Sequence, residues 1–210
     1  MSTSVDRETL ILMLRGASGL IRQNHDLLTR YDSAGGDGDH GTTMVRAMDN
    51  LEKAIDENSG MPLKDLLQAI GWAVMGTDGG ATGPLWGTFF SGMSDGIAGE
   101  TLDGASVAAA FEAGLKSIEK QTKAKVGDKT MMDALIPAVE AARKAVDEGQ
   151  DPAGVLAQAA QAAKLGAEST KDSAARFGRA RNVGAKSIGT PDAGATSVAL
   201  IFQGFVEALR

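Results

Sequence analysis

The chain has 210 residues, of which 43% are hydrophobic, and a net charge of −6. This length allows one large or two small domains with a sizeable core, and the absence of cysteine excludes disulfides, thiolate zinc sites and cysteine nucleophiles. The acidic balance and the scarcity of aromatic residues argue against nucleic acid as a partner, and neither a leader nor a membrane-length apolar run is found. We therefore expect a single domain over 1–210, cytoplasmic and without a membrane partner.

Apolar residues recur with helical spacing through almost the whole chain, whereas strands are hard to find. We predict eight helices, within 10–28, 44–55, 63–74, 84–93, 107–118, 132–146, a stretch that opens at Asp151, and one from 194 to 209. Asp151-Pro152 is typical of a helix start, an N-cap followed by proline at the first helical position. Eight helices with short connections predict an all-α fold, an up-and-down antiparallel bundle or closed barrel.

Glycine-rich segments lie at alternate junctions of these helices, at 35–41, 76–87 and 184–194. In an up-and-down arrangement, connections of the same parity lie at one end of the molecule, and the loop 122–130 joins them by the same count. Four polar loops should therefore meet on one rim. We expect a ligand site there.

The segment 31–41, Y-D-S-A-G-G-D-G-D-H-G, brings Asp32, Asp37 and Asp39 into a short stretch without lysine or arginine. Two like charges about 4 Å apart repel by about 4 kcal/mol at an effective dielectric of about 20, so a counter-ion is needed. Oxygen ligands favour Mg²⁺, Ca²⁺ or Mn²⁺, and Mg²⁺ leaves coordination positions for phosphate oxygens. The alternative is a solvated turn that caps the next helix.

The helix that opens at Gly41-Thr42-Thr43 offers backbone amides that favour a phosphate. A G-x-G-x-x-G match at 36–41 does not indicate a dinucleotide fold, because the residues before it have helical spacing rather than that of a strand. The segments 76–88 and 189–197 also end in helix starts; a ligand-free turn and ordinary capping are their alternatives.

Two histidines and a cluster of three arginines are the basic side chains to weigh for phosphate contact. Neighbouring carboxylates should favour the protonated form of His40, which could then contact a phosphate. His25 is interpreted as a surface residue. Arg176, Arg179 and Arg181 suit phosphate, with charge pairing to a protein surface as the alternative.

Four stretches, taken in order, carry a resemblance to a known family. L-L-T-R-Y-D-S-A-G-G-D-G-D-H-G-T-T-M, G-G-A-T-G-P-L-W-G-T-F-F, V-G-D-K-T-M-M-D-A-L and G-R-A-R-N-V-G-A-K-S-I-G-T-P-D-A-G-A-T-S resemble the nucleotide-binding L subunit of bacterial dihydroxyacetone kinase. The resemblance covers nearly the full length. It implies an eight-helix barrel that binds its nucleotide at one end.

The resemblance also implies the ligands and their contacts. The cofactors that it implies for this chain are ADP or ATP with two Mg²⁺ ions, the ions held by Asp32, Asp37 and Asp39. Phosphate contacts would come from His40, Gly41, Thr42, Thr43, Ala81 and Thr82, and adenosine contacts from Thr122, Met131, Arg179, Pro191, Asp192 and Ala193. Thr82 stands where the family often has serine, and Pro191-Asp192-Ala193 replaces a more usual sequence ending in Asp-Pro.

The implied activity is a kinase subunit without a protein nucleophile. It would pass a phosphoryl group from Mg-nucleotide to a short ketose held on a separate K subunit. In the phosphotransferase-linked form, which we favour, a phosphohistidine protein recharges bound ADP. The alternatives are an ATP-dependent dihydroxyacetone or tetrulose kinase, a nucleotide-binding regulatory module and a metal-dependent phosphohydrolase. Assembly, including a homodimer, stays open.

Overall fold

The computed structural model describes residues 4–209, which are all-α apart from one short strand pair. The α-helices in this part of the chain are α1 (Arg7–Gln23), α2 (His25–Ser33), α3 (His40–Asn58), α4 (Leu63–Met75), α5 (Thr82–Met93), α6 (Gly104–Glu119), α7 (Met132–Asp147), α8 (Pro152–Ser169) and α9 (Ala193–Glu207). Short 3₁₀ helices are η1 (Ser94–Gly96), η2 (Thr170–Asp172) and η3 (Arg179–Ser187). The all-α prediction is confirmed.

The strand pair was not predicted from the sequence. β1 (Val5–Asp6) pairs antiparallel with β2 (Thr101–Leu102), so that Val5 lies opposite Leu102. Each strand has only two residues, too few for an alternating pattern to be recognised in the sequence.

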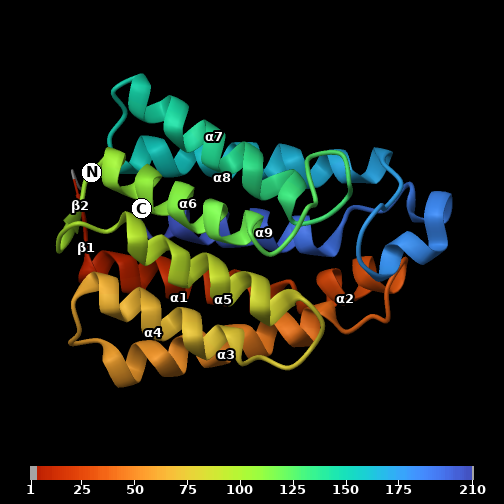
Figure 1. Ribbon diagram of the computed structural model, residues 1–210, viewed down its shortest axis with the longest axis horizontal. Helices are drawn as coiled ribbons and strands as arrows, with labels where there is room; N and C mark the ends of the chain where they lie inside the picture. Colours follow the sequence, from red (N-terminus) through yellow and green to blue (C-terminus); the bar gives the residue numbers. More distant parts are fainter. Residues whose placement is uncertain (1–3, 210) are drawn as a thin grey trace.

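The long helices lie side by side, and the contacts between them follow the chain (Figure 1). From α3 onward each helix packs against the next, α9 packs against α1, and α1 packs against α3. The succession of contacts therefore returns to its starting point, and the apolar faces of these helices share one core.

Aromatic side chains from α5, α6 and α9 occupy part of this core. Phe111 of α6 lies 5.0 Å from Phe202 and 6.2 Å from Phe205, measured between ring centroids, and Trp86 stacks on Phe90 at 5.7 Å. All are buried, and burying such a side chain stabilises the fold by about 1.5–3 kcal/mol. Phe89 of α5 stacks on Phe111 at 6.4 Å, so the rings connect α5 through α6 to α9.

The first predicted helix, over 10–28, is wrong in one respect, because the structure divides it at Asn24 into α1 and α2. The backbone N–H of Asn24 bonds to the carbonyls of Leu20 and Ile21, and its side-chain amide donates to Leu20 O at 2.9 Å. Asparagine favours such local bonds at helix ends. After this break α2 runs to Ser33 and carries Asp32 in its last turn.

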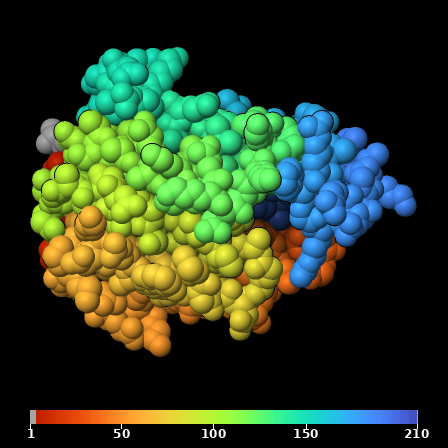
Figure 2. All heavy atoms as spheres, viewed as in Figure 1, coloured from red at the N-terminus to blue at the C-terminus, as the bar shows by residue number. Residues whose placement is uncertain are grey.

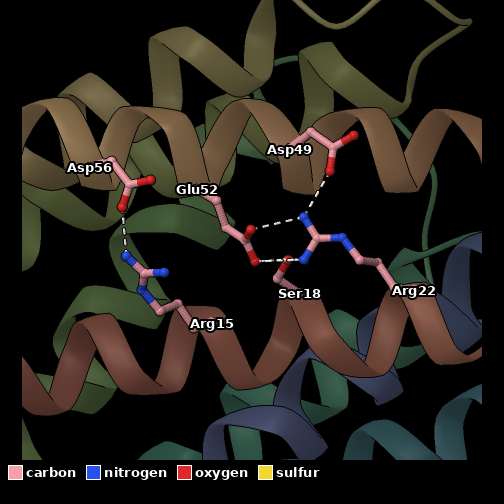
Figure 3. A network of polar contacts seen from close by, with 6 residues as sticks. All are labelled: Arg15, Ser18, Arg22, Asp49, Glu52 and Asp56. Atoms are coloured by element: carbon pink, nitrogen blue, oxygen red, sulfur yellow. Dashed lines mark hydrogen bonds and ion pairs between the residues drawn. The ribbon is translucent and has the colours of Figure 1, made fainter.

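A polar network joins α1 to α3 across the space between the two helices (Figure 3). The Arg22 guanidinium donates to both carboxylate oxygens of Glu52, at 2.6 and 2.9 Å, and to Asp49 at 2.7 Å. The buried Ser18 hydroxyl donates to Glu52, and Arg15 pairs with Asp56. The hydrogen bond from Arg22 is the main reason that the pKa of Glu52 is lowered. The ion pairs made by Arg22 and by Arg15 together hold α3 alongside α1.

The four polar connections lie at one end of the molecule, as the parity of the helices predicted (Figure 1). They are the segments 34–39, 76–81, 120–131 and 170–192. Figure 2 shows the last of these projecting from that end, with an indentation between it and the loop 120–131. Among the described residues, no helix is both long and apolar enough to cross a membrane.

Candidate functional site

The three aspartates singled out from the sequence come together at this rim. Asp32 lies in the last turn of α2, and Asp37 and Asp39 lie in the connection to α3. One carboxylate oxygen from each residue lies within 4.8 Å of the others; Asp32 is half-buried, and Asp37 and Asp39 are exposed. An oxygen-only donor set of this kind suits a hard divalent cation.

The connection folds around the Asp32 carboxylate. Asp32 Oδ2 accepts the backbone N–H of Asp39 at 3.0 Å and that of His40 at 3.3 Å. Gly36 packs against the same carboxylate so tightly that an added Cβ would overlap it, and Gly38 has φ +75°, where glycine is favoured. The glycines of this motif therefore serve to bring the three carboxylates together.

Arg179 of η3 reaches the cluster from the other end of the sequence. Its guanidinium forms an ion pair with Asp37 and lies 3.7 Å from Asp39. Arg176 pairs with Asp128 at 3.4 Å, while Arg181 is exposed on η3. For Arg176 and Arg179 the structure thus shows charge pairing within the chain, the alternative to a purely phosphate-facing basic cluster.

His40, the first residue of α3, links three helices. Its Nε2 lies 2.6 Å from Ser197 Oγ of α9, and its Nδ1 lies 3.3 Å from Thr82 Oγ1 of α5. Because the Ser197 hydroxyl donates to Ala193 O, we assign the imidazole proton to Nε2. Burial lowers the pKa of His40 to about 4, against the raising effect of Asp32. The expectation of a protonated His40 is wrong, because desolvation outweighs the charge of the carboxylate.

The neighbouring glycines and threonines explain how the loops approach one another. An added Cβ on Gly41 would overlap the backbone of His25, and one on Gly79 would overlap the buried Thr43 side chain. Thr42 Oγ1 lies 3.2 Å from His25 Nε2. His25 is therefore more than the surface residue that the sequence suggested, since it contacts Thr42, a candidate phosphate-binding residue. No sequence signal indicated this contact.

Two helix N-termini at the rim receive no side-chain cap from their own N-cap residue. Neither α3, with Asp39 at its N-cap, nor α5, with Ala81 at its N-cap, has a hydrogen bond from the capping side chain. At α9, by contrast, Asp192 Oδ2 accepts the N–H of Ala195 at 2.7 Å. Apart from the His40 N–H, which the Asp32 carboxylate accepts, first-turn amides and the positive end of the helix dipole favour an anion such as phosphate. The starts of α3 and α5 are thus suited to a phosphate group.

The other candidate residues lie on the α6–α7 and α8–α9 connections. Met131 is buried beside Gly194 at the start of α9. Pro191, Asp192 and Ala193 line a small cavity of about 30 Å³ together with Asp32. The Thr122 hydroxyl accepts the N–H of Ala124 at 3.1 Å within its own loop. Burial raises the pKa of Asp192 to about 7.

Lys129 and Asp133 are structural residues of the rim that the sequence analysis did not identify. The Asp133 carboxylate accepts the N–H groups of Gly127 and Thr130, each at 2.7 Å, and so shapes the α6–α7 loop. A threonine followed three residues later by an acidic residue is a capping pattern, and Thr130 to Asp133 fits it. That signal could have identified Asp133. Lys129 had none.

The comparisons with known proteins agree with one another. The family model described as "DAK2 domain" matches residues 34–207. The chain is 36% identical over 202 residues to the ADP-binding subunit DhaL of PEP-dependent dihydroxyacetone kinase 1 from Listeria innocua, covering 96% of each chain. It is 38% identical to L-erythrulose 1-kinase from Mycolicibacterium smegmatis, covering 95% of this chain but 35% of that protein.

A solved structure is similar as well. The dihydroxyacetone kinase of C. freundii, in complex with AMP-PNP and Mg²⁺, matches 93% of this chain and 33% of its own with a TM-score of 0.70 and 25% identity.

Proposed function

This chain belongs to the DAK2 domain family, and on that premise we propose that it is the nucleotide-binding subunit of a dihydroxyacetone-type kinase. It transfers a phosphoryl group from Mg-nucleotide to a short ketose held on a separate K subunit. The L. innocua relative is named as an ADP-binding subunit of a PEP-dependent enzyme and is matched along nearly its whole length, which favours ADP as a coenzyme recharged by a phosphohistidine protein.

The observation that carries the proposal is the meeting of three carboxylates with the N-termini of α3 and α5 on one rim, neither of which is capped by its own N-cap residue. Asp32, Asp37 and Asp39 offer only oxygen donors, as Mg²⁺ prefers, and the similar C. freundii kinase is in complex with AMP-PNP and Mg²⁺. We assign two ions to these carboxylates. Bound Mg²⁺ would neutralise the negative charge that spreads over the transferring phosphoryl group.

The side chains of this chain orient the nucleotide rather than react with it. We assign the phosphates to the segment His40–Thr43 and to Ala81 and Thr82, where the starts of α3 and α5 present backbone amides. Neutral His40 is held by Ser197 and Thr82 and so keeps these two helix starts in register. We assign the adenosine to Thr122, Met131, Arg179 and the loop 191–193. Such preorganised dipoles are a main source of catalysis in phosphoryl transfer.

We propose that α1 and α3–α9 form a closed eight-helix barrel, with α2 as an extension of α1 toward the rim. The succession of helix contacts, which returns from α9 to α1, supports this arrangement.

The M. smegmatis relative supports a second candidate function, an ATP-dependent kinase for a tetrulose. Because this chain spans about a third of that protein, the ketose site would then lie in the part without a counterpart here.

The proposed function predicts that Asp37→Asn weakens Mg-ADP binding by about tenfold or more, because the variant removes one ligand charge from the cluster. Titration calorimetry of the purified chain with ADP, with Mg²⁺ and then with EDTA, measures this. The matched control is Asp65→Asn, an exposed carboxylate in the first turn of α4, which should bind as the wild type does.

Turnover separates the alternatives. The chain alone should not phosphorylate dihydroxyacetone, whereas addition of the K subunit and a phosphoryl donor should restore turnover. Complete turnover by this chain alone would reject the two-subunit account. Phosphate release from a small phosphoester would instead indicate a phosphohydrolase. Nucleotide binding without turnover at any concentration of the partner would indicate a regulatory module.

A further inference from the structure

Lys129 is a buried cation at the rim for which the proposed nucleotide contacts provide no role. It lies in the α6–α7 loop, its side chain is almost inaccessible, and its ammonium donates to the carbonyl oxygens of Thr170 at 2.6 Å and Thr190 at 2.5 Å. These two carbonyls stand at the two ends of the segment 171–189. One side chain therefore joins both ends of the projecting segment to a different loop.

Other bonds close the base of the same segment. Gly189 N–H donates to Lys171 O at 2.7 Å, and Asp192 N–H donates to the Thr170 hydroxyl at 2.8 Å. Within the segment, Arg176 N–H donates to Asp128 O, next to Lys129 in the chain. The segment that carries Arg179 is thus a loop whose two ends are hydrogen-bonded to each other, and the Lys129 ammonium lies beside these bonds.

Two features of Lys129 are unfavourable on their own. Its φ of +60° places a non-glycine residue in the left-handed region, and burial lowers the pKa of its ammonium despite the nearby Asp192, Asp133 and Asp172. Strain of this kind persists where the surrounding structure imposes it, commonly beside functional sites. Here the left-handed backbone conformation of Lys129 accompanies a side chain that points toward the carbonyl oxygens of Thr170 and Thr190.

Direct contact between Lys129 and a phosphate does not fit this geometry. Its ammonium is already bonded to two carbonyl oxygens, and the cavity that it lines has a volume of about 30 Å³, about that of one water molecule. A lysine that binds phosphate would need a free donor facing a larger space.

We propose that Lys129 is a positioning residue, which holds the α6–α7 loop and both ends of segment 171–189 together around the nucleotide. The inference rests on the proposed function. Met131 follows Lys129 by two residues, Pro191 and Asp192 follow Thr190, and Arg179 lies within the segment. The residues that we assign to the adenosine therefore come from three stretches, and one ammonium joins them.

Lys129→Met tests this, since methionine fills a similar space without a donor. We expect the dissociation constant for Mg-ADP to rise by about tenfold or more, because the contacts are no longer preorganised. Binding of Mn²⁺ alone, followed by electron paramagnetic resonance, should not weaken, because the carboxylates lie in the last turn of α2 and in the connection 34–39, apart from Lys129. Trypsin should cut faster within 171–189, which contains Lys171, Arg176, Arg179, Arg181 and Lys186.

Two further variants complete the design. Lys125→Met, an exposed lysine in the same loop, should match the wild type in all three measurements. Lys129→Arg keeps a cationic donor and should recover part of the Mg-ADP affinity, which a general loss of stability would not do. Thermal unfolding of each variant verifies that it folds, and if Lys129→Met does not fold, Lys129→Arg and Lys129→Gln carry the test.

The outcomes separate the two proposals. Unchanged Mg-ADP affinity in Lys129→Met would overturn the inference, as would an equal loss of Mg-ADP and Mn²⁺ binding. If the wild type itself does not bind Mg-ADP, the proposed function fails. The trypsin result then decides alone whether Lys129 holds the segment.

Discussion

At the scale of single residues, Asp192 combines a helix cap with an unfavourable burial. Its carboxylate accepts the N–H of Ala195 at the start of α9, and burial raises its pKa to about 7 from an ordinary value of 3.8. The folded state therefore holds this proton more tightly than the unfolded state. The stabilisation is fully present below about pH 4 and is lost as the pH rises through about 7.

This predicts a distinct pH dependence for Asp192→Asn. Asparagine caps a helix as well as aspartate does but carries no charge. The free energy of unfolding of the wild type, relative to the variant, should fall by at least about 1 kcal/mol between about pH 5 and about pH 8, since one pKa unit corresponds to about 1.4 kcal/mol. Urea unfolding in EDTA across this range measures it. Parallel profiles of the two proteins would contradict the assigned pKa, and Asp65→Asn should give a parallel profile.

At the scale of elements, small residues bring helices together where the ring of contacts closes. Gly204 of α9 faces Ala17 of α1, and an added Cβ would overlap the Ala17 backbone. At Gly19, which lies on α1, an added Cβ would meet no atom within 4 Å. These two glycines have opposite roles. One permits the contact between α1 and α9, and the other only lowers the helix propensity of α1.

Alanine substitution should therefore have opposite effects at the two sites. Gly204→Ala should destabilise the protein by about 1–3 kcal/mol, because the helices must move apart. Gly19→Ala should stabilise it by about 0.5–1 kcal/mol, the difference in helix propensity between the residues. Chemical denaturation of both variants beside the wild type measures the change. Equal effects would mean that α1 and α9 are not in this close contact.

The alanine-rich run at 157–167 shows why composition alone was ambiguous. Ala159, Ala163 and Ala167 are buried on one face of α8, which packs against α7 and α9. Gln161 and Lys164 on the same helix are exposed. Close packing therefore accounts for the alanines spaced four residues apart, and helix propensity is sufficient for the other alanines of the run.

At the scale of the whole molecule, the position of the rim determines where a phosphoryl group can leave. The candidate site lies at the end formed by four loops, and η3 projects from that end (Figures 1 and 2). Under the proposed function a K subunit approaches this end, where Arg181 is exposed on η3. The start of α4, with the exposed Lys64, lies at the opposite end.

Charge reversal should distinguish the two ends. Arg181→Glu should raise the KM for the K subunit several-fold in the reconstituted reaction, because surface charges act mainly on encounter. The affinity for Mg-ADP should stay within about twofold of wild type. Lys64→Glu is the control and should alter neither quantity. The same KM for both variants would place the partner elsewhere.

The sequence by itself determined the all-α class, the gathering of four loops at one end and the Asp32, Asp37 and Asp39 cluster. These features depend on local residue spacing and on the number of helices, which a linear sequence displays directly. The tertiary structure alone decided that α1 ends at Asn24, that His40 packs between Ser197 and Thr82 and that Lys129 joins two loops. Burial and desolvation decide such features, and they depend on which distant groups, such as Ser197 and Thr190, fold back onto a residue.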